Sequence, residues 1–377
     1  MNRFKFEETV PNQSGAMEAD TASKNGASSK IQKIRWMIFS FVLAVFFSFG
    51  CDKEEILSTK YDIYLAGVNK DGFATYWKNG VAHVNQNLKG LYIGIAVENG
   101  DVYTLFRPEN SDVSSNHAYY KNNEAPVVIE GRALGIAVSN GNVYVTGNTG
   151  TAINNMTAHY WINGVRTTLS TRANAKSIFV SNDNVYIAGC TWHEYTTYPV
   201  ISAWYSRAVY WRNGTLVTLG GSYGNIAEAF SIFASGNDIY VGGYHGGTTV
   251  YTPYWKNGNL FNLPNTSGGR GNVGQIFVST DGTVHMAGIQ FISAGKYHIK
   301  YWRNNEEIFR YEVENTANYN ESLYVMSNMI SGFAVADNDI YIIGDDFEKT
   351  TNLKNGKIDN FTNEDGAKVF RIVDVPR

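Results

Sequence analysis

The residues with the greatest chemical potential in this sequence are aromatic. The longest predicted loop, Cys190–Arg207, contains Trp192 and Trp204. Both fall outside the repeated pattern described below, so that pattern does not require them. Exposed Trp and Tyr rings stack on sugars or anchor protein interfaces, because they offer a large contact area at a low cost in conformational entropy. The segment is therefore a candidate binding site. The alternative interpretation, in which these rings pack the loops onto the scaffold, stays open.

Neighbouring segments around residues 244–251 and 291–298 add further aromatic and histidine side chains. Together the three segments give ten candidate ligand-binding residues: Trp192, His193, Tyr195, Tyr198, Trp204, Tyr205, Tyr244, His245, Tyr251 and Tyr297. A glycan or a partner protein is the kind of ligand that such a set would bind.

Catalytic patterns are absent from the sequence. The seven histidines have no metal-ligand spacing, so we expect no metal site and no cofactor. Glycoside hydrolysis needs two carboxyl groups facing each other. The acidic candidates Glu109, Glu194 and Glu228 cannot be paired from sequence, and we interpret each as a solvated loop residue. Whether the protein is an enzyme is left open, and a non-catalytic role is favoured.

A repeated strand must position the candidate segments. Seven copies of a motif of the type Asp-Val-Tyr-x-x-Gly occur at spacings of 39 to 56 residues, beginning at Asp62, Asp101, Asn142, Asn184, Asp238, Thr283 and Asp339. Repeats of this length with several strands each are typical of β-propeller blades.

A second motif of the type Tyr-Trp-Lys-Asn-Gly follows each copy, as in Tyr254–Gly258. Asn-Gly predicts a two-residue type I′ hairpin turn, because both central residues need positive φ. The five repeated tryptophans belong to this motif, and we expect them to pack between sheets: Trp77, Trp161, Trp211, Trp255 and Trp302.

A third, apolar strand precedes each motif copy except the first, as in Ser177–Val180. An unassigned strand, Val369–Val375, remains at the C-terminal end. We therefore predict an all-β, seven-bladed propeller over residues 61–377, with four antiparallel strands per blade and a ring closed by Val369–Val375 beside Ile63–Gly67. Closure would remove exposed sheet edges. We expect a monomer.

The order of the motifs resembles Kelch-type propellers, whose Gly-Gly pair appears here at Gly242-Gly243. The segments Ala158–Trp161 and His117–Tyr119 resemble the extracellular HAF repeats, which read roughly His-Ala-Phe-x-Trp. Neither resemblance implies a single activity. Length variation lies in the connections after the Val-Tyr strands and between blades, so that end of the propeller is expected to be the functional one.

The amino-terminal segment indicates export. Lys30, Lys33 and Arg35 precede an apolar run of 15 residues ending at Gly50, which is too short for a spanning helix of about 20 residues and suits a signal peptide. Ser48–Cys51 resembles the bacterial lipobox, in which the cysteine is lipidated.

The following Asp52–Glu55 resembles the export tag of Bacteroidetes surface lipoproteins. We expect residues 1–50 to be the signal peptide, with a possible later start at Met17. Cys51 is then the lipidation site, and residues 51–60 form a tether. The resemblance implies an outer-membrane lipoprotein exposed at the cell surface.

Composition excludes one class of partner. The net charge is −3 and the region after the signal has no basic run, so nucleic-acid binding has no electrostatic support. Three roles remain. The favoured one is a surface-anchored, non-catalytic module that binds a glycan or a protein. The alternatives are a glycan-active hydrolase or lyase, and a scaffold subunit of an outer-membrane assembly.

Overall fold

The computed structural model describes residues 61–111, 115–197, 201–222, 225–246, 252–264, 269–293, 296–314, 329–345, 350–362 and 366–376. The chain divides into two compact units, Met1–Ser58 and Thr59–Arg377, and every described residue belongs to the second. The signal peptide, Cys51 and the tether lie outside the described residues, as do Tyr198 and Tyr251.

The described residues form β-strands and no helix. In chain order the strands are β1 (Tyr61–Val68), β2 (Phe73–Lys78), β3 (Val81–Glu98), β4 (Asp101–Pro108), β5 (His117–Lys121), β6 (Val127–Ile129), β7 (Arg132–Ser139), β8 (Asn142–Thr149), β9 (Thr157–Ile162), β10 (Val165–Thr171), β11 (Ala173–Ser181), β12 (Asn184–Thr197), β13 (Ile201–Arg212), β14 (Thr215–Gly220), β15 (Ala227–Ser235), β16 (Asp238–His245), β17 (Pro253–Lys256), β18 (Asn259–Asn262), β19 (Gly271–Val278), β20 (Val284–Ser293), β21 (Lys296–Arg303), β22 (Glu306–Glu314), β23 (Ile330–Ala336), β24 (Asp339–Asp345), β25 (Thr350–Lys354), β26 (Lys357–Ile358) and β27 (Lys368–Pro376).

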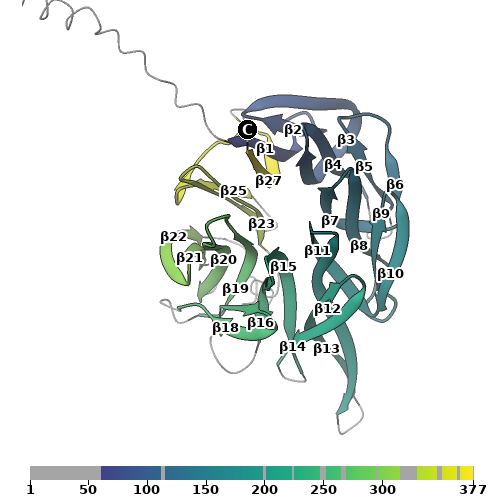
Figure 1. Ribbon diagram of the computed structural model, residues 1–377, viewed down its shortest axis with the longest axis vertical. Helices are drawn as coiled ribbons and strands as arrows, with labels where there is room; N and C mark the ends of the chain where they lie inside the picture. Colours follow the sequence, from purple (N-terminus) through teal and green to yellow (C-terminus); the bar gives the residue numbers. More distant parts are fainter. Residues whose placement is uncertain are drawn as a thin grey trace, which may run out of the picture. The chain divides into compact units, whose positions relative to one another are not determined.

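The strands assemble into antiparallel sheets in which neighbours along the chain are neighbours in space (Figure 1). Five sheets have four strands each: β7–β10, β11–β14, β15–β18, β19–β22 and β23–β26. The all-β class and the four-stranded repeat agree with the sequence analysis. The arrangement is propeller-like.

One sheet differs from the expected pattern, because it has seven strands in the order β27-β1-β2-β3-β4-β5-β6. The sequence analysis expected separate outer and inner strands where β3 runs. Instead, β3 is continuous over 18 residues. Residues 81–89 pair with β2 and residues 90–98 pair with β4. β3 therefore belongs to two sets of four strands, β27-β1-β2-β3 and β3-β4-β5-β6.

The C-terminal strand β27 pairs antiparallel with β1, with Ile63 opposite Asp374 and Leu65 opposite Ile372. This is the pairing expected for Val369–Val375. The strands that begin each set of four, called the inner strands below, are β3 (residues 90–98), β7, β11, β15, β19, β23 and β27. Each contacts the next in this order, and β27 also contacts β3.

Every inner strand carries a β-bulge at the same place. The register shifts between Tyr92 and Gly94, Ala133 and Gly135, Ala175 and Ser177, Ala229 and Ser231, Val273 and Gln275, and Ile330 and Gly332, while in β27 the shift skips Phe370. A bulge inserts one unpaired residue and turns its side chain in a new direction. Nothing in the sequence pattern predicts these bulges.

The repeated Asn-Gly turns have the geometry that the sequence predicted. Asn257 and Gly258 have φ of 51° and 80°, and both central residues also have positive φ in the turns Asn79–Gly80, Asn122–Asn123, Asn163–Gly164, Asn213–Gly214, Asn304–Asn305 and Asn355–Gly356. This is the requirement of a type I′ turn.

Side chains of the motif also attach the turns to the neighbouring strand. Asn257 Oδ1 accepts a hydrogen bond from the Ile239 amide at 2.8 Å, and Asn257 Nδ2 donates to Asp238 at 2.7 Å. The Lys256 ammonium pairs with Asp238 at 2.7 Å and lies 5.1 Å from the centre of the Tyr240 ring. The same Lys–Asp pair recurs at Lys78–Asp62, Lys121–Asp101 and Lys354–Asp339. These contacts of the motif's Asn, Asp and Lys side chains, called the hairpin clamp below, attach the Asn-Gly turn to the neighbouring strand.

The repeated tryptophans form the core between the sheets, as the sequence predicted. Trp77, Trp161, Trp211, Trp255 and Trp302 are each at most 1% exposed. They pack in separate hydrophobic clusters with Val, Ile, Leu and Tyr side chains of their own and adjacent sheets.

Candidate binding site

The aromatic segment predicted as a long loop is a β-hairpin. Strands β12 and β13 stay paired from Tyr186 opposite Arg212 to Thr197 opposite Ile201. The segment is rich in Thr, Tyr, Trp and Ile, which favour pleated strands, so the two strands continue instead of opening into a loop. This corrects the loop assignment.

The hairpin extends beyond its flanking strands (Figure 1). The ladder to β11 reaches Ala173 opposite Thr191, and the ladder to β14 reaches Gly220 opposite Ala208. Beyond these pairs the two strands are bonded mainly to each other, with one added hydrogen bond from the Trp192 amide to the Arg172 carbonyl at 2.7 Å. The extension carries five of the ten candidate residues.

The register separates these five side chains into two faces, because directly opposed residues of an antiparallel pair share a face and successive residues alternate. His193 is opposite Tyr205, and Tyr195 follows on the same face. Trp192 and Trp204, the latter opposite Glu194, occupy the other face.

The first face is a ladder of rings. The His193 and Tyr205 rings stack with centroids 5.4 Å apart, and Tyr195 lies 5.9 Å from Tyr205. The Arg207 guanidinium donates to the Tyr205 hydroxyl at 2.9 Å and lies 5.4 Å from the ring centre. Burial, reinforced by the Arg207 charge, lowers the pKa of His193. The imidazole is therefore mostly neutral at pH 7, and its Nε2 lies 3.0 Å from the Thr191 hydroxyl, with which it forms a hydrogen bond.

The second face presents tryptophan beside opposite charges. The exposed Arg172 places its guanidinium carbon 5.2 Å from the centre of the Trp204 ring, within cation–π range. Trp192 and Trp204 are both partly exposed, and Glu194 is exposed. A half-exposed indole flanked by a cation and a carboxylate can stack on a flat apolar face while the charges bind hydroxyl or peptide groups.

The remaining described candidates do not join this surface. Tyr244 is 3% exposed and packs with Phe230, and Tyr297 is 2% exposed within the β20–β22 core. His245 is partly buried with its ring centroid 6.4 Å from that of Trp255, and burial lowers its pKa. These three side chains contribute to packing in this structure.

The acidic candidates are dispersed among the described residues. Glu109 and Glu194 are exposed. Glu228 is 8% exposed and forms an ion pair with Lys176, so its interpretation as a solvated loop residue was wrong. Burial raises the pKa of the nearby Cys190 thiol, which is free and buried. Within the described ranges no group of three or more His, Cys, Asp or Glu side chains could hold a metal ion.

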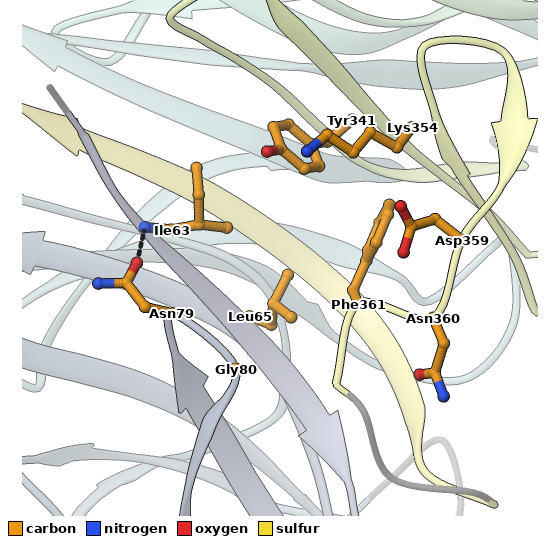
Figure 2. Close-up of a pocket in the computed structure, with 9 residues that line it drawn as sticks. All are labelled: Ile63, Leu65, Asn79, Gly80, Tyr341, Lys354, Asp359, Asn360 and Phe361. Atoms are coloured by element: carbon orange, nitrogen blue, oxygen red, sulfur yellow. Dashed lines mark hydrogen bonds between the residues drawn. The ribbon is translucent and has the colours of Figure 1, made fainter. Parts of the chain in front are cut away.

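A cavity of about 260 Å³ is lined on one side by β1 and the Asn79-Gly80 turn, and on the other by β24, β25 and residues 359–361 (Figure 2). Tyr341 and Phe361 meet edge to face at 5.6 Å. Lys354 and Asp359 also line the cavity, and Asn79 accepts a hydrogen bond from the Ile63 amide at its border. It lies beside the Asn-Gly turns, at the end that sequence reasoning treated as structural.

A second cavity, of about 240 Å³, is lined by residues of all seven inner strands. Its charged lining residues, Lys176 and Arg371, were not candidates in the sequence analysis. No sequence signal could have identified them, because the lining depends on the recurring bulge and on the placement of β27.

No protein-family model and no curated protein matches the sequence. Solved structures resemble it distantly. A computationally designed protein, Ika8, has a TM-score of 0.40 at 11% identity, covering 81% of this chain and 79% of its own. The Aleuria aurantia lectin bound to alpha-methyl-L-fucoside has 0.40 at 9%, covering 75% and 93%. A neuraminidase-like protein from A/flat-faced bat/Peru has 0.38 at 10%, covering 77% and 91%. At these scores the likenesses carry no argument about function.

In the part of the chain that the structure describes, no helix has the length and apolar character needed to cross a membrane.

Proposed function

We propose that residues 61–377 form a seven-bladed β-propeller closed by β27. In this proposal β3 serves both as the outer strand of the first blade and as the inner strand of the second. Seven sequence repeats support it, as do the pairing of β27 with β1 and the succession of contacts among the inner strands from β3 to β27 and back to β3.

On this scaffold we propose a non-catalytic binding module for a glycan or a partner protein. The observation that carries the proposal is the β12–β13 extension, which holds five partly exposed aromatic or imidazole rings on a hairpin that reaches past its neighbours. Rings held on paired strands lose little entropy on binding, since their backbone is already ordered.

We further propose that the module is displayed on the outer face of the outer membrane through a lipid on Cys51. The support is the sequence alone: the apolar run ending at Gly50, the lipobox-like Ser48–Cys51 and the acidic tag after it. Metabolic labelling with a palmitate analogue tests this. Wild-type protein should incorporate label, and Cys51→Ala should not.

A glycan array, followed by titration of the best ligand, tests the binding role. Trp204→Ala should weaken binding about thirtyfold, because removing a central aromatic anchor costs about 2 kcal/mol and about 1.4 kcal/mol corresponds to a factor of ten. The matched control is Phe261→Ala, which removes an exposed ring (41%) on β18 and should leave affinity unchanged.

Equal effects of the two substitutions would contradict a site on the hairpin. If no glycan binds, the same pair of variants applies to protein partners captured by cross-linking at the cell surface. Capture that is unaffected by Trp204→Ala would end the proposal.

A further inference from the structure

The inner-strand cavity is built by the recurring bulge. Four of its lining residues are the unpaired residues of their bulges: Leu134, Lys176, Phe230 and Ser331. Residues one or two positions after the bulges supply most of the rest. Since a bulge turns its extra side chain out of the ladder, seven bulges at one level bring side chains of all inner strands around one space.

The lining is chemically uneven. On one part it consists of glycine and aliphatic side chains, such as Gly94, Gly135 and Ile136. Elsewhere it contains the Ser177 hydroxyl, the Gln275 amide, which is hydrogen-bonded to Ser231 and to the Ile330 carbonyl, and the two charged side chains, both of which are cations. A polar group that lines a cavity can position a ligand, whereas the aliphatic wall supplies contact area.

The charge around the cavity is positive on balance. Lys176 on β11 pairs with Glu228 on β15 and lies over the Phe230 ring at 4.6 Å. Arg132, at the start of β7, is near enough to interact electrostatically with Lys176. Arg371 comes from β27, and its Nη1 donates to the Phe370 carbonyl at 2.7 Å. Two cations line the cavity, Lys176 and Arg371, and the Glu228 carboxylate neutralises one of them, so one positive charge remains among these groups.

We propose that the inner-strand cavity binds an oxyanion, a carboxylate or phosphate group, carried by a molecule no larger than a monosaccharide. A guanidinium presents donors in a fork that matches either oxyanion, and an ammonium adds a point charge. The volume of about 240 Å³ is below the range of roughly 300–1,000 Å³ that is usual for drug-sized ligands. This site is separate from the hairpin and does not depend on the role proposed for it.

Titration calorimetry on the full-length chain tests the proposal with three probes of similar size: glucuronate, glucose 6-phosphate and neutral glucose. We expect one equivalent of at least one anion to bind, with an affinity about tenfold or more above that of glucose, because only the anions can form charge-assisted hydrogen bonds with Lys176 and Arg371. A tenfold difference corresponds to about 1.4 kcal/mol. The preferred anion distinguishes a carboxylate from a phosphate ligand.

Arg371→Gln should weaken binding of that anion about tenfold or more, whereas Arg303→Gln, at an exposed arginine of β21, should not. Because β27 also pairs with β1, Ser177→Asp serves as a second variant that adds repulsion inside the cavity without altering β27. Trp204→Ala should leave anion binding intact.

Two results would overturn the proposal. The first is that neither anion binds more tightly than glucose. The second is that Ser177→Asp, or a folded Arg371→Gln, binds the anion as well as wild type does.

Discussion

At the residue scale, Asp374 on β27 is a carboxyl group whose pKa the fold shifts strongly. Burial raises its pKa to about 6 from an ordinary value of 3.8. The folded protein therefore holds this proton more tightly than the unfolded chain does. Between about pH 4 and pH 6 the folded state binds more protons, so stability from this group is present below that window and is lost as the pH rises through it.

Asp374→Asn should remove this penalty. We expect the free energy of unfolding to rise by about 2 kcal/mol at pH 7.5 and to change little at pH 4, since a shift of one pKa unit corresponds to about 1.4 kcal/mol. Urea unfolding at the two pH values measures the difference, with the exposed Glu306→Gln as control. A gain of equal size at both pH values would exclude the buried charge as its cause.

Residue types predicted the candidate surface only in part. Trp192 and Trp204 stood out because the repeat does not need them, and both are partly exposed. Tyr244 and Tyr297 looked equivalent in sequence, yet both are buried. A tyrosine ring suits a core and a surface equally well, so the type alone could not separate them. The paired Lys176 and Glu228 are 52 positions apart, and only the fold brings them together.

At the element scale, the hairpin clamp explains why the motif repeats. The Asn side chain accepts from one backbone amide and donates to an Asp, while its own backbone has positive φ. Each function restricts the residue type at that position. The turns were accordingly predictable from local sequence, because all the interacting groups lie on consecutive strands of one sheet.

Substitutions at Asn257 separate the two functions. Asn257→Gly loses the side-chain hydrogen bonds but tolerates φ of 51°. Asn257→Ala loses the same hydrogen bonds and is also strained at this φ. We expect Ala to lower the free energy of unfolding by about 1 kcal/mol more than Gly does, as measured by urea unfolding. If Gly is the more harmful substitution, left-handed backbone geometry is not what the motif preserves.

Strand extent was harder to predict than turn position. β3 is continuous where a break between two strands was expected, and β12 and β13 stay paired where a loop was expected. The bulges were also missed, since an inserted residue has no marker when the bulged positions hold residues as different as Leu134, Lys176 and Phe230. These features arise from pairing between strands, which periodicity does not encode.

At the scale of the whole molecule, β27 connects the last part of the chain to the first. It pairs with β1, contacts β23 and β3, and supplies Arg371 to the inner-strand cavity. The order of repeats predicted this pairing, because one inner strand was missing at the start and one strand was left over at the end. The inner-strand cavity could not be predicted in this way, because its lining comes from all seven inner strands and not from one segment.

Hydrogen exchange of β27 tests the closed arrangement most directly. If β27 closes a cooperative ring, its amides bonded to β1 should exchange only with global unfolding, at the rate of the protected amides in β16. The measurement uses the unmodified chain, with exchange followed by mass spectrometry of peptides covering both strands. Exchange of β27 many times faster than that of β16 would mean that the last strand opens independently and does not close the fold.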